Sequence, residues 1–166
     1  MTSEAAARRP LSAGARRVQE TLRERGFAEL EVVEFDVAMR TSADAARVVG
    51  CELAQIAKSL VFRAERTGRA VMVIASGAHR VDEARIAELI GEPIGRADPD
   101  FVREHTGQPI GGVAPLAHAR PLEMLVDEDL LRLELLWAAA GHPNALFRLT
   151  PEQLVRMTSG RVARVT

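Results

Sequence analysis

The sequence predicts an α+β fold, with a mixed, mainly antiparallel sheet and flanking helices. Several short segments alternate apolar and polar residues as strands do, and others repeat apolar residues at helical spacing. Strands and helices follow one another without strict alternation, which argues against a purely parallel sheet. The length of 166 residues and a hydrophobic content of 47% fit one domain with a substantial core.

The predicted helices combine an apolar stripe with residues that start or stop a helix. The first has Ala15, Val18 and Leu22 on one face and ends at Gly26. Ser42 is the expected N-cap of the second. Helices are expected at residues 12–25, 42–49, 82–90 and 98–105, and a last one is opened by Thr150-Pro151-Glu152 with the pattern of a capping box.

The predicted strands are short apolar runs bounded by turn residues. They are expected at residues 30–35, 55–63, 70–75, 121–126, 131–138 and 145–149. The second and third flank the turn Glu65-Arg66-Thr67-Gly68, so we expect them to form a β-hairpin. Residues 1–11 lack such a pattern and are expected to be a flexible N-terminus.

Charge and cysteine content narrow the functional classes. A formal net charge of −1 argues against a protein that coats duplex nucleic acid, but it leaves room for binding a short nucleic-acid end. Cys51 is the single cysteine, so no intrachain disulfide can form and a reducing compartment is expected. No apolar run approaches the roughly 20 residues that cross a bilayer. The expectation is a cytoplasmic protein with no membrane partner.

Lys58 is the first candidate functional residue. Lys and Arg together number 22, and Lys58 is the only lysine among them. A site that needs a compact amine, which arginine cannot supply, would resist replacement by arginine. Strand alternation places Lys58 with Ile56, Leu60 and Phe62 on one apolar face. A lysine there is costly unless it reaches a cleft or a partner, so the pattern predicts a pocket.

The loop Gly111-Gly112-Val113-Ala114-Pro115 is the second candidate site. Adjacent glycines allow the backbone to approach a ligand and present unhindered N–H groups. Such donors can bind a carboxylate, a phosphate or the oxyanion of an acyl-transfer transition state. The alternative interpretation is a tight turn between two strands.

Together, these two stretches resemble the YbaK/prolyl-tRNA-synthetase-associated editing domains. The similarity is carried by Gln55-Ile56-Ala57-Lys58-Ser59-Leu60 and by Gly107-x-x-Ile110-Gly111-Gly112-Val113-x-Pro115, within a region from about Phe35 to Gly160. The length resembles that of a free-standing member, so residues 12–166 are expected to form one YbaK-like domain.

The resemblance implies a hydrolase that deacylates mischarged aminoacyl-tRNA in trans. The expected substrate is tRNA-Pro, or another tRNA that carries a small wrong amino acid at its 3′ acceptor end. A synthetase is a further candidate partner, no cofactor is implied, and the oligomeric state stays open. Arg8, Arg9, Arg16 and Arg17 could contact the tRNA backbone, although a solvated helix face is the alternative.

The resemblance also implies roles for individual residues. Lys58 would contact the aminoacyl or terminal-nucleotide end, either as a positioning charge or, with a lowered pKa, as a base. Gly111 and Gly112 would surround the scissile carbonyl. A positioning charge needs fewer assumptions than a base. The further substrate-binding candidates are Val113, Pro115, Gly141, His142, Asn144, Asp36, Thr41 and His118.

Other chemistries find less support in the sequence. The histidines show no metal-ligand spacing and Cys51 has no companion, so no metal is expected. His79 is expected to be structural, and the same role is the alternative for His118 and His142. Two other functions stay open. One is a non-catalytic tRNA- or amino-acid-binding regulator or adaptor of the same fold, and the other is a Schiff-base enzyme built on Lys58.

Overall fold

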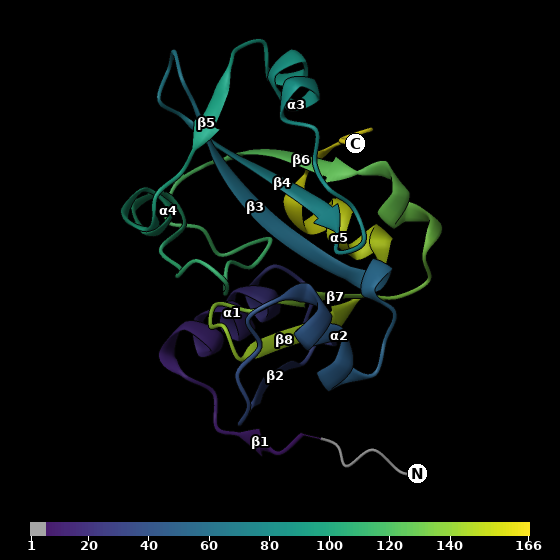
Figure 1. Cartoon of the computed structure of the whole chain (residues 1–166). Coiled ribbons are helices and arrows are strands. Elements are labelled where there is room, and N and C mark those ends of the chain that lie inside the picture. Colours follow the sequence, from purple (N-terminus) through teal and green to yellow (C-terminus); the bar gives the residue numbers. More distant parts are fainter. Residues whose placement is uncertain (1–5) are drawn as a thin grey trace.

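A mixed sheet forms the centre of the computed structural model, which describes residues 6–166 (Figure 1). Its order is β1-β2-β8-β7-β3-β4-β6-β9, and β5 pairs with β3. The strands are β1 (Arg8–Arg9), β2 (Val32–Phe35), β3 (Ile56–Ala64), β4 (Ala70–Ser76), β5 (Ile94–Arg96), β6 (Glu123–Asp127), β7 (Leu136–Ala139), β8 (Ala145–Leu149) and β9 (Arg161–Ala163). The β3–β7, β4–β6 and β6–β9 pairs are parallel and the other pairs are antiparallel, which confirms the predicted class.

Helices cover both faces of this sheet. They are α1 (Ala13–Glu24), α2 (Ser42–Val49), α3 (Glu83–Ile90), α4 (Pro99–Thr106) and α5 (Pro151–Thr158), with the 3-10 turns η1 (Leu53–Gln55) and η2 (Glu128–Arg132). α1 and α5 bury their apolar stripes in the largest core cluster, around Met72 and Phe147. On the other face, α2 and α3 form two separate clusters, which include Ile56 and Val73 respectively. Within residues 6–166, no helix is long and apolar enough to cross a membrane.

Most predicted elements are confirmed to within a few residues. The hairpin of β3 and β4 pairs Ala57 with Ser76 through to Arg63 with Ala70. One capping residue was wrong: the Thr41 side chain, and not that of Ser42, accepts the Asp44 N–H at the start of α2. Thr41 has the extended backbone of an N-cap, whereas Ser42 is already helical.

One predicted strand differs from the structure, and three short strands were not predicted. Residues 131–138 were expected to form one strand, but Leu131 and Arg132 belong to η2 and only residues 136–139 form β7. Of the N-terminus expected to be flexible, residues 1–5 lie outside the described part, and Arg8–Arg9 pair with β2 as strand β1. The three-residue strands β5 and β9 were not predicted, because so short a segment has no measurable alternation.

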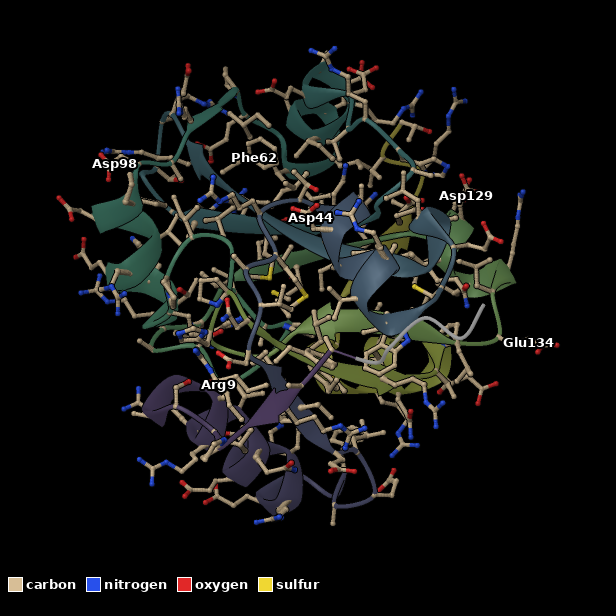
Figure 2. All side chains as sticks on the ribbon, turned by 60° about the horizontal axis from the view of Figure 1, so that its bottom comes forward. Arg9, Asp44, Phe62, Asp98, Asp129 and Glu134 are labelled. Carbon is tan, nitrogen blue, oxygen red and sulfur yellow. The ribbon has the colours of Figure 1, made fainter. Side chains whose placement is uncertain are left out.

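Glu34 fastens the N-terminal segment to the sheet. Its side chain is 2% exposed, and it accepts a 2.5 Å hydrogen bond from Arg9 Nε, which lies on β1 near α1 (Figure 2). Its other oxygen accepts the N–H and the hydroxyl of Ser12, at 3.0 and 2.7 Å. Burial raises the pKa of Glu34, but the bonds from Ser12 and the charge of Arg9 outweigh burial and hold the pKa below 4.5.

We therefore expect acid to loosen this contact. A carboxyl whose pKa is lower in the folded protein stabilises it fully above its ordinary pKa of 4.5, and loses that contribution as pH falls through the folded value. At pH 7, Glu34→Gln should reduce the free energy of unfolding by about 1–3 kcal/mol, because buried donors lose an acceptor. It should also flatten the dependence on pH below 4.5.

Urea unfolding from pH 3 to pH 7 measures both effects. The matched control is Glu31→Gln, since Glu31 is exposed and lies 3.8 Å from Arg8, which is also exposed. Such a surface pair contributes about 0–1 kcal/mol. Equal effects of the two substitutions would contradict the role given to Glu34.

Candidate functional site

Strand β3 is paired along one edge and open in the middle of the other. β4 pairs with residues 57–63 on the first edge. On the second edge, β7 pairs with Ile56 and Ala57 only, and β5 pairs with residues 62–64 only. No strand in the described chain pairs with residues 58–61 on this second edge.

Hydrogen bonds show which residues of β3 face the open edge. Gly77 N–H donates to Ile56 O at 2.7 Å, and Ala64 N–H donates to Arg69 O at 2.9 Å. In an antiparallel pair, hydrogen-bonded and non-hydrogen-bonded residues alternate, so the even-numbered residues of β3 bond to β4. Ser59 therefore directs its backbone N–H and C=O toward the open edge.

A cavity of about 370 Å³, here called the Lys58 cavity, lies at this open edge. Its walls come from the loop before α2, the middle of β3, the loop at residues 110–113, and the segment from β7 to β8. Four predicted site residues line it, namely Lys58, Thr41, Gly111 and Val113. Side chains of Met39, Leu60 and Leu146 add apolar surface.

Lys58 lies between the two core clusters on the α2 and α3 face of the sheet. Its strand neighbours on that face are Ile56 and Leu60, and its cross-strand partner is Ala75. Nζ donates to the backbone carbonyl of His79 at 2.5 Å. Burial lowers the pKa of Lys58, and the negative charge of Asp127 opposes that shift.

The glycine loop is held by its own backbone. Gly112 N–H donates to Pro109 O at 2.9 Å, and Gly112 O accepts the Gly141 N–H at 2.7 Å. A Cβ at Gly112 would lie 2.6 Å from the backbone carbon of His142, so a glycine is needed for this close approach. Among residues 6–166, the N–H groups of Gly111 and Val113 have no hydrogen-bond partner. They are the donors this loop can offer to a ligand.

The turn from β7 to β8 supports the loop and does not itself present its polar side chains to the cavity. His142 Nδ1 accepts the Asn144 N–H at 3.0 Å, and His142 Nε2 lies 3.5 Å from Arg9 Nη2. Asn144 O accepts the Phe35 N–H, which ties the turn to β2. Asp36 is exposed and its N–H donates to Ala7 O at 2.7 Å. The structure thus places Asp36, His142 and Asn144 outside the walls of the Lys58 cavity.

His118 and Pro115 lie at a different hollow. They line a second cavity together with Arg25 and residues of α5. His118 Nε2 lies 2.7 Å from Ala114 O, and burial lowers the pKa of His118 while this hydrogen bond opposes the shift. The chain leaves the Lys58 cavity after Val113, which separates these two candidates from it.

Ser59 also lines the Lys58 cavity, although no pattern in the sequence marks it as a site residue. Its hydroxyl is buried and has no hydrogen-bond partner within the described chain. Alternation places it on the opposite face from Lys58, so strand periodicity alone could not join the two. The two residues meet at the cavity because the middle of β3 has an open edge. That edge is open because β7 pairs only with residues 56–57 of β3 and β5 only with residues 62–64.

One group of side chains could offer ligand atoms to a metal ion. Single atoms of His79, Asp127 and Asp129 lie within 4.8 Å of one another. Both oxygens of Asp127 already accept backbone N–H groups, from Ser76 at 3.1 Å and from Asp129 at 3.0 Å. Hydrogen bonds therefore account for this arrangement without an ion.

The glycine loop generates a stability prediction. Gly112→Ala should lower the free energy of unfolding by about 1–3 kcal/mol, because the added methyl overlaps the backbone of His142. Gly111→Asn is the matched control. Gly111 has φ +87 and open space around it, and asparagine tolerates that conformation. Urea unfolding compares the two variants, and a Gly112→Ala protein as stable as wild type would contradict the packing argument.

Comparisons with known proteins found chains similar to this one. A solved structure described as a proposed trans-editing enzyme for prolyl tRNA synthetase superimposes with a TM-score of 0.90 at 46% identity, covering 95% of this chain and 99% of the other. The protein YwhH of Bacillus subtilis (strain 168) is 33% identical over 134 residues, which are 81% of this chain and 85% of YwhH.

Part of a synthetase is also similar. The proline–tRNA ligase of Xanthomonas campestris pv. campestris (strain 8004) is 29% identical over 92 residues, which are 55% of this chain but 16% of the ligase. Residues 36–157 match the family described as the aminoacyl-tRNA editing domain. This region contains β3, the Lys58 cavity and the glycine loop. The chain belongs to the aminoacyl-tRNA editing domain family.

Proposed function

We propose that this protein is a trans-acting deacylase, which hydrolyses the ester between a small wrong amino acid and the 3′ end of a tRNA. The observation that carries the proposal is the Lys58 cavity, where a half-buried amine and the free N–H groups of Gly111 and Val113 share one opening in the sheet. A tRNA of the proline type is the first candidate, because the similar ligase and the similar solved structure are named for proline. We place the reaction in the cytoplasm.

Lys58 acts in this proposal as a positioning charge. An ammonium has three donors, and the His79 carbonyl takes one of them. The other donors are available for a phosphate or carbonyl oxygen at the aminoacyl end of the tRNA. A charge-assisted hydrogen bond of this kind is stronger than a neutral one, so the ester is held in place for attack.

The glycine loop acts on the developing negative charge. Water attacks the ester carbonyl, and N–H groups that point at the oxyanion stabilise it without reorganisation. Gly112 N–H is already bonded to Pro109 O, so we assign the donation to Gly111 and Val113. Gly112 then serves as the residue that lets the loop approach the His142 backbone. An aminoacyl ester is already activated, so modest stabilisation is sufficient.

The preference for a small amino acid is part of this proposal and rests on the similarity to the editing domains. The volume of about 370 Å³ leaves room for the ester and adjoining atoms of the tRNA end beside a side chain such as that of alanine, serine, threonine or cysteine. Discrimination by one methylene contributes only about 1–3 kcal/mol, which is the reason a separate editing step is useful. The net charge of −1 fits contact with the acceptor end alone, and a synthetase that delivers the tRNA remains a candidate partner.

The direct test offers a panel of mischarged tRNAs to the wild-type protein and to Lys58 variants. We expect wild type to deacylate at least one of them, and Lys58→Ala to be slower by about 10- to 100-fold, the loss of one hydrogen bond to a charged group. Lys58→Arg should recover only part of the rate, because a planar fork replaces a compact ammonium. Arg63→Ala, which removes an exposed charge from the same strand, is the control.

Each outcome addresses a different part of the proposal. Failure of wild type to deacylate any charged tRNA in the panel would overturn the enzymatic function, and tight binding of charged tRNA without turnover would favour the non-catalytic adaptor. A Lys58→Ala protein as fast as wild type would contradict only the role of Lys58.

A further inference from the structure

Asp127 is a buried carboxylate that the proposed chemistry does not use. It is 1% exposed and ends β6, which runs parallel to β4. Because the carboxyl ends of parallel neighbours meet at one edge of a sheet, Asp127 lies beside Ser76, the last residue of β4. Oδ2 accepts the Ser76 N–H at 3.1 Å and lies 2.9 Å from His79 Nδ1, while Oδ1 accepts the Asp129 N–H at 3.0 Å.

These bonds fix the turn that follows β4. Ser76 Oγ donates to Ala54 O at 2.8 Å, and His79 N–H donates to Ser76 O at 2.9 Å. Gly77 N–H donates to Ile56 O, which closes the turn onto the start of β3. The His79 carbonyl is then the group in this turn that accepts the Lys58 ammonium. Asp127 therefore reaches Lys58 through the ring and the backbone of His79.

Lys58 needs such support. Its four-carbon side chain loses considerable rotamer freedom when it is held in one place, and this entropy loss opposes an ordered position. The apolar neighbours Ile56 and Leu60 fill the same face but offer no hydrogen-bond acceptor from their side chains. A fixed carbonyl acceptor supplies what they lack, and the negative charge of Asp127 favours the charged form of the amine.

We propose that Asp127 and His79 are positioning residues for Lys58: the carboxylate holds the His79 ring, and the His79 carbonyl then holds the ammonium at the wall of the Lys58 cavity. This inference rests on the proposed function only for its effect on catalysis. The side chain of Asp129, at the periphery of the molecule (Figure 2), lies 3.7 Å from His79 Nδ1 and 3.6 Å from Arg132. Asp127 is closer to the same nitrogen, at 2.9 Å, so we assign the hold on the ring to Asp127.

The first experiment needs no enzymatic activity. Lys58 is the only lysine, so protein made with lysine labelled with ¹³C at Cε gives one lysine resonance, and its titration reports the pKa of Lys58 directly. Asp127→Asn should lower this pKa further, because a nearby negative charge is removed. His79→Ala should change the chemical shift of the resonance. Glu128→Gln, which removes an exposed charge from the adjacent residue, should leave both unchanged.

The second experiment measures deacylation in a double-mutant cycle. His79→Ala should lower kcat by about 3- to 10-fold with KM changed by less than about twofold, because a contact beside the reacting end is disturbed. His79→Asn should restore most of kcat, since its amide can donate to Asp127 as Nδ1–H does. In a Lys58→Ala background, His79→Ala should have no further effect.

The outcomes separate positioning from a purely structural role. A structural role would lower the melting temperature and slow the reaction equally with or without Lys58, and His79→Asn would be no better than His79→Ala. That result, or an unchanged Lys58 resonance in both the Asp127 and His79 variants, would overturn the inference. If Asp127→Asn does not fold, the two His79 variants decide the matter. If wild type deacylates nothing, the proposed function fails while the resonance still tests the positioning.

Discussion

The interrupted edge of β3 is the constraint on which the site depends. An unpaired strand edge presents free backbone groups, and proteins normally cover such an edge or pair it. Here β7 pairs with the first residues of β3 and β5 pairs with the last, and the Lys58 cavity lies at the unpaired stretch between them. The same gap separates the α2 cluster from the α3 cluster, so an amine on that face is partly removed from water without being sealed in the core.

Backbone contacts between glycines connect this edge to the rest of the fold. α1 approaches the turn between β7 and β8 so closely at Gly14 that a Cβ there would overlap the Gly141 carbonyl. Gly141 N–H bonds to Gly112 O, and Gly112 lies against the backbone of His142. Each contact requires the absence of a side chain. The free N–H groups of the loop are therefore positioned by the packing of α1, with the Glu34 bonds holding the chain that leads into that helix.

The sequence carries most of the fold but only part of the site. Glycine stops and apolar periods place helices α2 to α4 within a residue or two, and β8 matches its predicted bounds. The strand predicted at residues 131–138 is wrong at its start because Asp127 caps η2 through the Asp129 N–H, a tertiary arrangement that an apolar run does not reveal.

Two predicted site residues lie away from the Lys58 cavity. His118 and Pro115 follow the glycine loop but line another hollow. The buried amide of Gln108 causes this, because it binds the Ala114 N–H and the Leu116 carbonyl and turns the chain away.

Lys58, by contrast, is predicted as a site residue by strand alternation and by being the only lysine of the chain, and both observations indicate an amine in a cleft. The surroundings of that amine then bear on its role. A general base needs an unprotonated nitrogen, whereas a carbonyl acceptor and the buried carboxylate of Asp127 both favour the ammonium. Burial acts in the opposite sense, but the surface that buries Lys58 is also what strengthens its attraction for an anionic or carbonyl oxygen. Burial is the larger effect, so the pKa of Lys58 is lowered on balance. The proposal of a held charge therefore rests on the hydrogen bond from Nζ to the His79 carbonyl, which only a donor can make.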